Sequence, residues 1–593
     1  MLLHKRLKTI KSFASPKYIN RKEIIPYLFI IFLIWMSRFL LSNSFGLYED
    51  DWAFSGNAIT NTFAENFSRI SSALFTFWQG RPLHMSLLTL LPSLGSQFGG
   101  TDALYFLGFL ILSSNACLIY YLLKRVSYQP YVPIIATLFF CLYPADTTFS
   151  YLQHLFGLQT SLLFLLIAFH CYLSAGEGHV YLKILSYLMS ILSLLTYESP
   201  FLTFLVTPFL LRNKSKKQII IHFCIVGISL FSYLMLRKMA GEQRVVGLGT
   251  TSLTQTVLYQ ILAGPLIAVA TYFLRPLELF QLLKHENILI LPLVLSFLYL
   301  LINYLFSNEK QITNKNNTNQ LNIPELLAIG TAITILAYPS ALTLSVNIID
   351  GRASRVHFAA SLGTAIILSC LWNYMIIKSG SKQALRKLTI FLLALHLSLL
   401  FVFCLNVQNL YKVSWQNQRE FWSDVTKLSP DLEENTVILV QAPSLASGKQ
   451  INPFDWSVPS VLSSIYYFPK SWKYPPRLYI LNSSASNIDG WKSMIQKNNL
   501  FLMSNRTNSL KYYYEWEPDR KVDPKDVILL VEERNQLSRK SLLELPNGDT
   551  ISLKQTTSKA SGKEYKKSVL FNRLVDNPSE NRRNERPVTY FQN

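Results

Sequence analysis

The chain has 593 residues, of which half are hydrophobic and only 15% are charged, with a formal net charge of +21 at pH 7. Its apolar residues come in blocks of about 14 to 21 with almost no charge, which is typical of a protein that crosses a membrane many times. Lys and Arg lie between these blocks, so the positive-inside rule accounts for the basic excess, and nucleic acid is not expected as a partner.

The N-terminal region is strongly basic. Residues 1–23 hold seven Lys and Arg residues and a single acid, so we expect them to lie in the cytoplasm. The first apolar block, residues 24–41, is long enough to span and would carry residues 43–102 to the extracytoplasmic face. A moderately apolar stretch of that loop, residues 83–94, would lie along the membrane surface or dip into it.

Further apolar blocks continue to residue 407, and the sequence predicts a polytopic α-helical membrane protein with about 11 to 13 spans. The block at 184–211 is too long for one straight span, and Pro200 would break it into an up-and-down pair. The block at 257–274 could span or be re-entrant. The basic run 378–387 is expected inside and residues 348–358 outside, which requires that 257–274 does not cross fully. All six cysteines fall in apolar blocks, so no disulfide framework is expected.

The C-terminal third is more polar. Three β-branched runs bounded by turn residues, "NTVILVQAP", "PRLYIL" and "DVILLVEE", predict strands, and "FWSDVTKL" predicts a helix. With residues 24–407 as the transmembrane domain, we expect a small extracytoplasmic domain, α/β or mainly β, over 408–555. Residues 556–593 are rich in Lys, Arg, Asn and Ser and are expected to be disordered.

Three consecutive acids, Glu49, Asp50 and Asp51, follow the first span in "YEDDW". They could be solvated residues at the end of a helix. The flanking Tyr48 and Trp52 favour the membrane interface instead, where partial desolvation would raise a carboxylate pKa and improve it as a proton acceptor. Paired acids can hold a divalent cation, so Asp50 and Asp51 allow a metal site but do not require one.

Arginines occur in the same loop and in a later one. Arg81, in "GRPL", could snorkel to lipid headgroups or bind a phosphate through its planar fork. Arg352 and Arg355, in "DGRASRVHF", are spaced i to i+3, so they would share a helical face and could clamp an anion. The alternative for this segment is an ordinary cytoplasmic basic loop. Arg38, inside the first span, could belong to the same site or merely snorkel.

Other ionisable residues are expected near the same face. Glu198, in "TYESP", is unusual because an ionisable side chain inside an apolar hairpin is a functional candidate. The residues predicted to bind substrate are Glu49, Arg81, Asp146, His154, Glu198, Arg352, Arg355 and His357. No Walker loop, HExxH, GxSxG or CxxC pattern is present. Acids that could activate a hydroxyl, together with cations that could hold a phosphate, therefore suggest transfer of a group from a lipid phosphate.

A first span with its N-terminus inside, followed by an acidic pair in a large outer loop, resembles the GT-C superfamily of integral-membrane glycosyltransferases. The superfamily includes protein mannosyltransferases and the aminoarabinose transferase of lipid A. The resemblance covers residues 20–405 through pattern more than identity. It implies a polyprenyl-phosphate sugar donor and chemistry on the extracytoplasmic face.

The resemblance also implies roles for single residues. Asp50 or Asp51 matches the family's first-loop acid, and Asp146 stands where many members have a second acid. "GRPL" resembles the element that lines the donor site, and "GRASRVHF" resembles late loops that contact the carrier phosphate. "LTYESP" resembles a Pro-broken hairpin that some members write as "LTKGP", but it lacks the basic residue.

The sequence therefore predicts an inverting GT-C-type glycosyltransferase of the plasma membrane, with its C-terminal domain outside. Asp51 or Asp50 would deprotonate a hydroxyl of a glycan, lipid or protein acceptor, while Arg81, Arg352 and Arg355 stabilise the leaving phosphate. Three alternatives stay open. They are an envelope-polysaccharide polymerase or ligase with a diphosphate donor, a transporter or flippase of lipid-linked sugars, and a membrane anchor for the outer domain.

Overall fold

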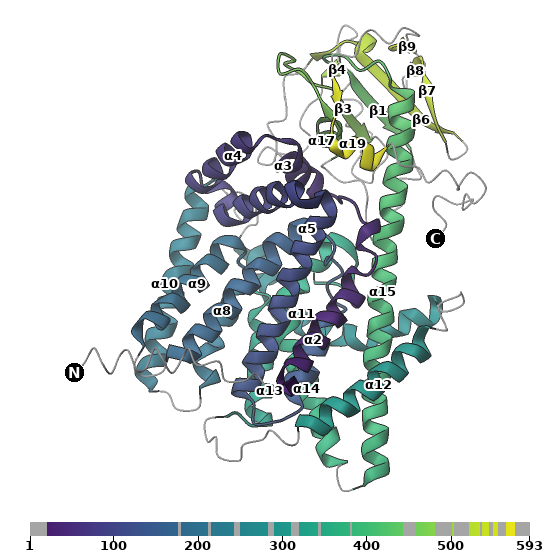
Figure 1. Ribbon diagram of the computed structural model, residues 1–593. Coiled ribbons are helices and arrows are strands. Elements are labelled where there is room, and N and C mark those ends of the chain that lie inside the picture. Colours follow the sequence, from purple (N-terminus) through teal and green to yellow (C-terminus); the bar gives the residue numbers. More distant parts are fainter. Residues whose placement is uncertain are drawn as a thin grey trace.

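The computed structural model describes residues 21–175, 179–211, 215–241, 250–282, 290–309, 320–341, 346–379, 382–442, 458–480, 501–502, 521–533, 536–544, 550–555 and 565–575. Up to residue 428 these residues are almost entirely helical, and they form the bundle in Figure 1.

Within these ranges, seven helices are long and apolar enough to cross a membrane. They are Glu23–Ser44, Pro82–Val126, Leu152–Ala175, Lys216–Met239, Thr254–Leu279, Gly351–Lys378 and Gln383–Leu428. Shorter apolar helices lie at Val132–Cys141, Val180–Thr196, Phe201–Leu210, Leu291–Phe306 and Ile323–Leu336. The prediction of a polytopic helical membrane protein is confirmed.

The elements of the bundle follow one another in this order: α2 (Arg21–Ile34), η1 (Trp35–Phe39), η2 (Ser42–Ser44), η3 (Trp52–Gly56), α3 (Asn57–Thr60), α4 (Phe63–Phe75), η4 (Trp78–Gly80), α5 (Pro82–Val126), α6 (Val132–Cys141), α7 (Leu152–His154), η5 (Leu155–Gln159), α8 (Thr160–Ala175), α9 (Val180–Thr196), η6 (Phe201–Leu210), α10 (Lys216–Met239), α11 (Thr250–Leu282), α12 (Ile290–Glu309), α13 (Ile323–Leu336), η8 (Gly351–Ala360), α14 (Ser361–Lys378) and α15 (Gln383–Leu428). The chain breaks between α9 and η6 at Pro200, as the sequence predicts.

Helix α15 connects the bundle to the C-terminal domain. It is 46 residues long, or about 70 Å at 1.5 Å per residue, which exceeds the thickness of a bilayer core. In Figure 1 it runs the whole length of the bundle and ends against the sheet; we call this end of the bundle the upper end. The expected domain boundary at 407/408 falls inside this continuous helix, and the predicted helix in "FWSDVTKL" is its last part.

The loop between the first two spans is helical. A capping box between Thr62 and Glu65 starts α4, which packs against the first part of α5. Residues 83–94, the stretch expected at the membrane surface, belong to this part of α5. Gly99 and Gly100, with φ of +156° and +63°, then bend α5 before its spanning part, because left-handed backbone favours glycine. Helix α4 was not expected from the sequence.

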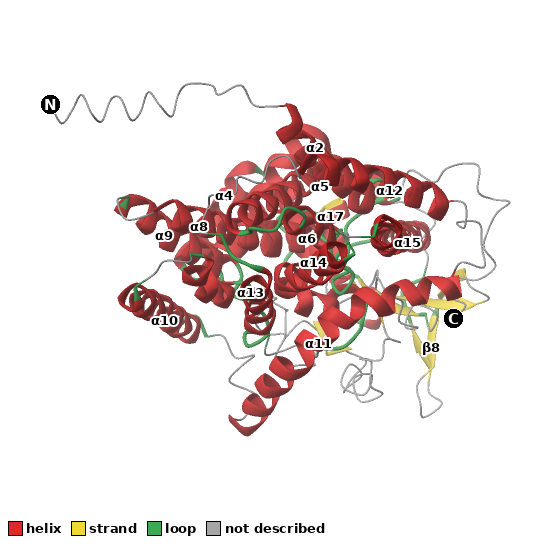
Figure 2. Ribbon diagram, turned by 90° about the horizontal axis from the view of Figure 1, so that it is seen from below, coloured by secondary structure: helices red, strands yellow, loops and turns green. Residues whose placement is uncertain are grey.

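Helix α11 contains the ambiguous block 257–274. By length and composition it could span a membrane, and two of its residues contact residues that lie between α13 and η8. The Gln260 side chain donates to the carbonyl of Ala341, and Arg275 pairs with Asp350. Figure 2, seen along the bundle, shows α15 end-on and α11 and α12 lengthwise. The helix therefore lies across the bundle, and that the block 257–274 does not cross the membrane fully stays a prediction from the charge pattern.

The C-terminal domain is a small mixed α/β unit. Its main sheet has the order β3-β1-β6-β7, in which β1 (Val437–Gln441) pairs in parallel with β3 (Arg477–Ile480) and with β6 (Val527–Glu533). Strand β7 (Gln536–Lys540) pairs with β6 in the antiparallel sense. The three predicted strand segments are the three parallel strands. Smaller elements are α17 (Val458–Ile465), β2 (Tyr466–Tyr467), β4 (Phe501–Leu502), β5 (Lys521–Val522), η10 (Pro524–Asp526), β8 (Leu542–Glu544) and β9 (Thr550–Ser552).

The prediction of disorder from residue 556 onward is wrong for residues 565–575. Strand β10 (Lys566–Lys567) pairs with β2, and helix α19 (Val569–Leu574) follows it. Phe571 and Leu574 are buried, and the Tyr466 ring lies 5.1 Å from that of Phe571. A few well-placed apolar residues anchor this segment although its composition is polar. The rest of 556–593 lies outside the described residues.

Candidate active site at the upper end of the bundle

The acids of YEDDW lie in a turn between η2 and η3, at the upper end of the bundle. All three are buried, and Glu49 has a left-handed φ of +43°. A non-glycine residue rarely adopts this conformation, and its cost must be offset by contacts around it. The alternative in which these acids are solvated is therefore wrong.

Asp51 is enclosed by backbone amides. Its carboxylate accepts hydrogen bonds from the backbone N–H groups of Tyr48 (3.3 Å), Leu152 (3.2 Å) and Gln153 (2.8 Å). Burial raises the pKa of Asp51 to about 7, although these hydrogen bonds act in the opposite direction. The carboxylate thus joins the acidic turn to the start of α7, and both of its oxygens are engaged in doing so.

Glu49 and Asp50 face an arginine from a distant part of the chain. Asp50 Oδ2 lies 3.3 Å from Arg352 Nη2, and Glu49 Oε2 lies 3.9 Å from Arg352 Nε. The Tyr151 hydroxyl donates to the other oxygen of Glu49 at 2.8 Å. The two carboxylate side chains are 5% exposed, whereas that of Arg352 is 32% exposed, so the cluster opens toward solvent on the arginine side.

Arg355 and His154 extend this cluster. Arg352 and Arg355 belong to η8, a 3₁₀-helix, in which residues i and i+3 are eclipsed, so they share one face. The Nε of Arg355 is buried without a hydrogen-bond partner, and so is Nδ1 of His154. The His154 ring lies 5.3 Å from that of Tyr151, and both arginines act on it electrostatically. We call Glu49, Asp50, His154, Arg352 and Arg355 the acid–arginine cluster.

Other predicted residues support this cluster from behind. Asp146 Oδ1 accepts from the backbone N–H (2.9 Å) and hydroxyl (2.6 Å) of Thr148, and burial raises its pKa. His357 contacts the Tyr338 hydroxyl (2.8 Å) and the carbonyl of Asn347 (3.0 Å), which occupies both ring nitrogens. Each of these side chains orders the loop that carries it.

Arg38 does not snorkel. It is buried and donates to the carbonyls of Cys141 (3.1 Å) and Tyr143 (2.8 Å), and its guanidinium lies 3.8 Å from the centre of the Phe149 ring. These carbonyls belong to the end of α6, where backbone acceptors need partners.

Arg81 and Glu198 form a second cluster. Arg81 makes a two-pronged contact with the Glu198 carboxylate, to Oε2 at 2.8 Å and also to Oε1. Arg237, at the end of α10, donates to Glu198 Oε1 at 3.0 Å, and the Tyr233 hydroxyl donates to Oε2 at 3.2 Å. Burial acts to raise the pKa of Glu198, but the two guanidinium groups hold it well below its ordinary value. We call Arg81, Glu198 and Arg237 the arginine–glutamate cluster.

The two clusters are connected through aromatic side chains. The Arg81 guanidinium lies 4.3 Å from the centre of the Tyr197 ring, and the His84 ring lies 5.7 Å from the same ring. His84 packs over Gly157, where a Cβ would come within 2.3 Å of the imidazole. It also acts electrostatically on His154. The upper end of the bundle thus carries a row of ionisable side chains, with carboxylates at one end and a net positive charge at the other.

The C-terminal part of the chain holds the acidic turn in place. The Tyr48 hydroxyl donates to the carbonyl of Tyr411 (2.8 Å), and the Gln418 amide donates to the carbonyl of Leu47 (3.0 Å). Gly46 packs directly beneath the ring of Trp415, where a Cβ would lie 1.9 Å from the indole. These residues of α15 were not predicted, because nothing local in the sequence links them to residues 46–48.

Helix α19 reaches the same turn. Arg573 donates to the carbonyl of Phe45 (3.0 Å) and to Asp102 Oδ1 (2.9 Å). A segment whose composition predicted disorder therefore contacts the residues just before the acids.

No group of three or more His, Cys, Asp or Glu side chains that could hold a metal ion is found in the part of the chain that the structure describes. At Asp50 the neighbouring cation is Arg352, and the Asp51 oxygens accept backbone hydrogen bonds.

The fold and the site together define a class, a polytopic helical membrane protein with buried charge clusters beneath a small mixed α/β domain. No protein-family model matches the sequence. No curated protein matches it either. Among solved structures, the chain is similar to the crystal structure of ArnT from Cupriavidus metallidurans bound to undecaprenyl phosphate, with 11% sequence identity and a TM-score of 0.35. The match covers 86% of this chain and 92% of that chain. So low a similarity transfers no residue role.

The arginine–glutamate cluster should be essential for stability. Arg81→Ala leaves a buried carboxylate with fewer partners and should lower the free energy of unfolding by up to about 3–5 kcal/mol. The double variant Arg81→Ala/Glu198→Ala should lose less than the sum of the two single variants, because it removes both charges. Thermal unfolding in detergent checks this, and additive losses would contradict the ion-pair account.

The environment of Asp51 predicts a pH dependence of stability. Its folded-state pKa of about 7 lies above the unfolded value of about 4, so folding favours the protonated acid. This contribution is full below about pH 4 and is lost as the pH rises through about 7. Asp51→Asn cannot ionise, so its unfolding temperature should change less between about pH 5 and pH 8 than that of the wild type. Equal changes in both proteins would show that Asp51 does not titrate in this range.

Proposed function

We propose that the protein is a membrane glycosyltransferase of GT-C type that transfers a sugar from a polyprenyl-phosphate donor to an acceptor hydroxyl. The observation that carries the proposal is the acid–arginine cluster, in which two buried carboxylates face a partly exposed arginine beside Arg355. Such a cluster offers a proton acceptor and an anion-binding group side by side. The resemblance of residues 20–405 to the GT-C superfamily supports the same proposal.

Between the two catalytic candidates, the geometry favours Asp50 as the base. Asp51 already accepts three backbone hydrogen bonds, so a substrate hydroxyl would have to compete with them. Asp50 instead lies against Arg352, on the side where the cluster is exposed. In this assignment Asp51 positions the turn, and Glu49, held by the Tyr151 hydroxyl, orients Arg352.

The reaction then proceeds as a direct displacement. Asp50 accepts the proton of the acceptor hydroxyl while that oxygen attacks the anomeric carbon. The bond between this carbon and the phosphate oxygen breaks, and polyprenyl phosphate leaves with the electron pair and an additional negative charge. Arg355 and Arg352 stabilise this charge, which is largest in the transition state and after it.

Arg352 couples the two halves of this step. In the resting site it compensates Glu49 and Asp50. When Asp50 takes up the proton it becomes neutral, and the guanidinium is released to bind the leaving phosphate. Arg81 takes no direct part in this scheme, because its fork is occupied by Glu198.

An assay with purified protein in liposomes and a radiolabelled polyprenyl-phosphate sugar tests the proposal. Asp50→Asn should reduce the transfer rate by about 100- to 10,000-fold, as expected for loss of a general base, with an unchanged protein level. Arg355→Ala should weaken donor use by about 10- to 100-fold, since it removes charge-assisted hydrogen bonds. Arg355→Lys should recover only part of this, because it lacks the planar fork.

Glu65→Gln is the matched control, since this half-exposed acid on α4 lies outside both clusters. Its Oε1 pairs with Lys470 of the C-terminal domain in an ion pair of little energetic weight. Its Oε2 accepts the capping hydrogen bonds from Thr62, which a glutamine oxygen also accepts. Full activity of Asp50→Asn would refute the assignment of the base. Transfer only from a diphosphate-linked donor would favour the polymerase or ligase alternative.

We also propose that the upper end of the bundle faces the outside of the cell and that residues 1–23 are cytoplasmic, as the charge pattern predicts. Protease added to intact cells should then digest the C-terminal domain, and a tag at Met1 should be reached only after the membrane is opened. Protection of the C-terminal domain in intact cells would place the site on the cytoplasmic face.

A further inference from the structure

Gln418, on α15, holds both ends of the acidic turn. Its side chain is fully buried. Its Oε1 accepts a hydrogen bond from the indole Nε1 of Trp52 at 2.9 Å, and its Nε2 donates to the carbonyl of Leu47 at 3.0 Å. Leu47 directly precedes residues 48–51, and Trp52 directly follows them. A single amide group therefore connects the two ends of the segment that carries the acids.

The two partners of Gln418 require opposite hydrogen-bonding groups. An indole N–H can only donate and a backbone carbonyl can only accept, so the side chain between them must accept at one atom and donate at another. The glutamine amide does both, and its partners fix which end is the oxygen. A carboxylate of the same size would only accept, and an apolar side chain would do neither.

The direction of the Asp50 carboxylate depends on how this turn is held. Within the turn the Asp51 N–H donates to the carbonyl of Tyr48 at 2.9 Å, and Glu49 has its left-handed φ of +43°. Asp50 lies between these two residues, and its Oδ2 is 3.3 Å from Arg352. A shift of either end of the turn would move this carboxylate relative to the arginine.

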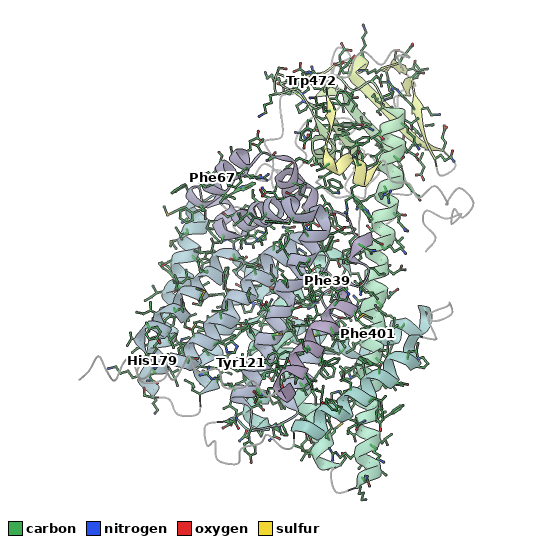
Figure 3. All side chains as sticks on the ribbon, viewed as in Figure 1. Phe39, Phe67, Tyr121, His179, Phe401 and Trp472 are labelled. Carbon is green, nitrogen blue, oxygen red and sulfur yellow. The ribbon has the colours of Figure 1, made fainter. Side chains whose placement is uncertain are left out.

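Helix α15 makes the same kind of contact at a second level. Gln408, which is 2% exposed, accepts from the backbone N–H of Leu41 at 3.0 Å and donates to the carbonyl of Met36 at 3.0 Å. It lies about 15 Å from Gln418 along the helix, at 1.5 Å per residue. Figure 3 marks Phe39, in the segment that Gln408 holds, part way along the bundle beside α15. The two glutamines share residue type, helix, burial and contact geometry, but only Gln418 holds the acidic turn.

We infer that Gln418 is a positioning residue for the transfer reaction. By joining Leu47 to Trp52 it fixes the acidic turn, so that Asp50 faces the acceptor hydroxyl and Arg352. This inference rests on the proposed function and extends it to the C-terminal part of the chain. The base lies in the first loop, and the residue that orients it belongs to the helix that leads into the C-terminal domain.

Gln418→Met tests the inference, with Gln408→Met as the matched control. Each change leaves one buried N–H and one buried carbonyl without a partner, so both variants should lose a similar amount of unfolding temperature. In the liposome transfer assay, kcat of Gln418→Met should fall by about 100-fold, an effect expected when a catalytic group is slightly misplaced. Gln408→Met should keep a kcat near that of the wild type. The donor KM should change little in either, since Arg355 lies on η8.

Two further measurements make the test independent of one variant and of catalysis. Trp52→Phe keeps a ring against Trp415 and removes only the indole donor, so its kcat should fall by about tenfold, as loss of one buried hydrogen bond permits. Hydrogen exchange reports on the turn directly. The backbone amides of Asp51 and Trp52, which donate within the turn, should exchange faster in Gln418→Met and at the wild-type rate in Gln408→Met.

Equal kcat values in Gln418→Met and Gln408→Met, at equal loss of unfolding temperature, would overturn the inference and leave Gln418 with a structural role alone. Unchanged hydrogen exchange of the turn in Gln418→Met would overturn it as well, whether or not transfer is observed. If Gln418→Met does not fold, full activity of Trp52→Phe has the same meaning. Absence of transfer by the wild-type protein would instead contradict the proposed function, and the exchange measurement would still decide whether Gln418 holds the turn.

Discussion

Burial of three consecutive carboxylates is the constraint on which the rest of the upper end depends. A carboxylate removed from water is unstable unless hydrogen bonds or cations compensate it. The chain uses a different solution for each acid. Asp51 receives backbone N–H groups, Glu49 receives a tyrosine hydroxyl, and Asp50 faces Arg352. The partners come from α7, the residue before it and η8, so these segments must meet at the acidic turn.

The same constraint explains the length of α15 and the place of α19. A turn with a left-handed glutamate needs contacts that restrict it, and the C-terminal third of the chain supplies them. Tyr411, Trp415 and Gln418 project from the part of α15 near the C-terminal domain, and Arg573 comes from α19. The C-terminal domain is thus part of the structure that shapes the acidic turn. A separate domain tethered to an independent membrane unit would make no such contacts.

Local patterns in the sequence were sufficient to predict many elements of the fold. The β-branched runs that begin near Val437, Arg477 and Val527 became strands, because short apolar runs between turn residues fit a buried parallel sheet. The break at Pro200 also follows from the sequence. The prediction of disorder from composition was wrong at residues 565–575. There the burial of Phe571 and Leu574 stabilises a segment whose composition is polar on average.

The site was only partly accessible to sequence reasoning, for a physical reason. The acids and the arginines could be identified as unusual residues, but their partners are set by contacts between distant segments. Arg81 lies next to Glu198 and Arg237, and no spacing in the sequence relates these three positions. Helix α4 was not predicted although its apolar residues recur at helical spacing, because it is only 13 residues long and lies in a polar loop between two spans.

The two clusters divide the charged residues into a group proposed to react and a group that supports it. The most direct measurement of this division is an experimental structure of the protein with a bound polyprenyl phosphate. The account predicts that the phosphate lies within hydrogen-bond distance, about 3 Å, of Arg355 and Arg352, with Asp50 beside it. A phosphate bound instead by Arg81 and Arg237, with Glu198 displaced, would contradict it.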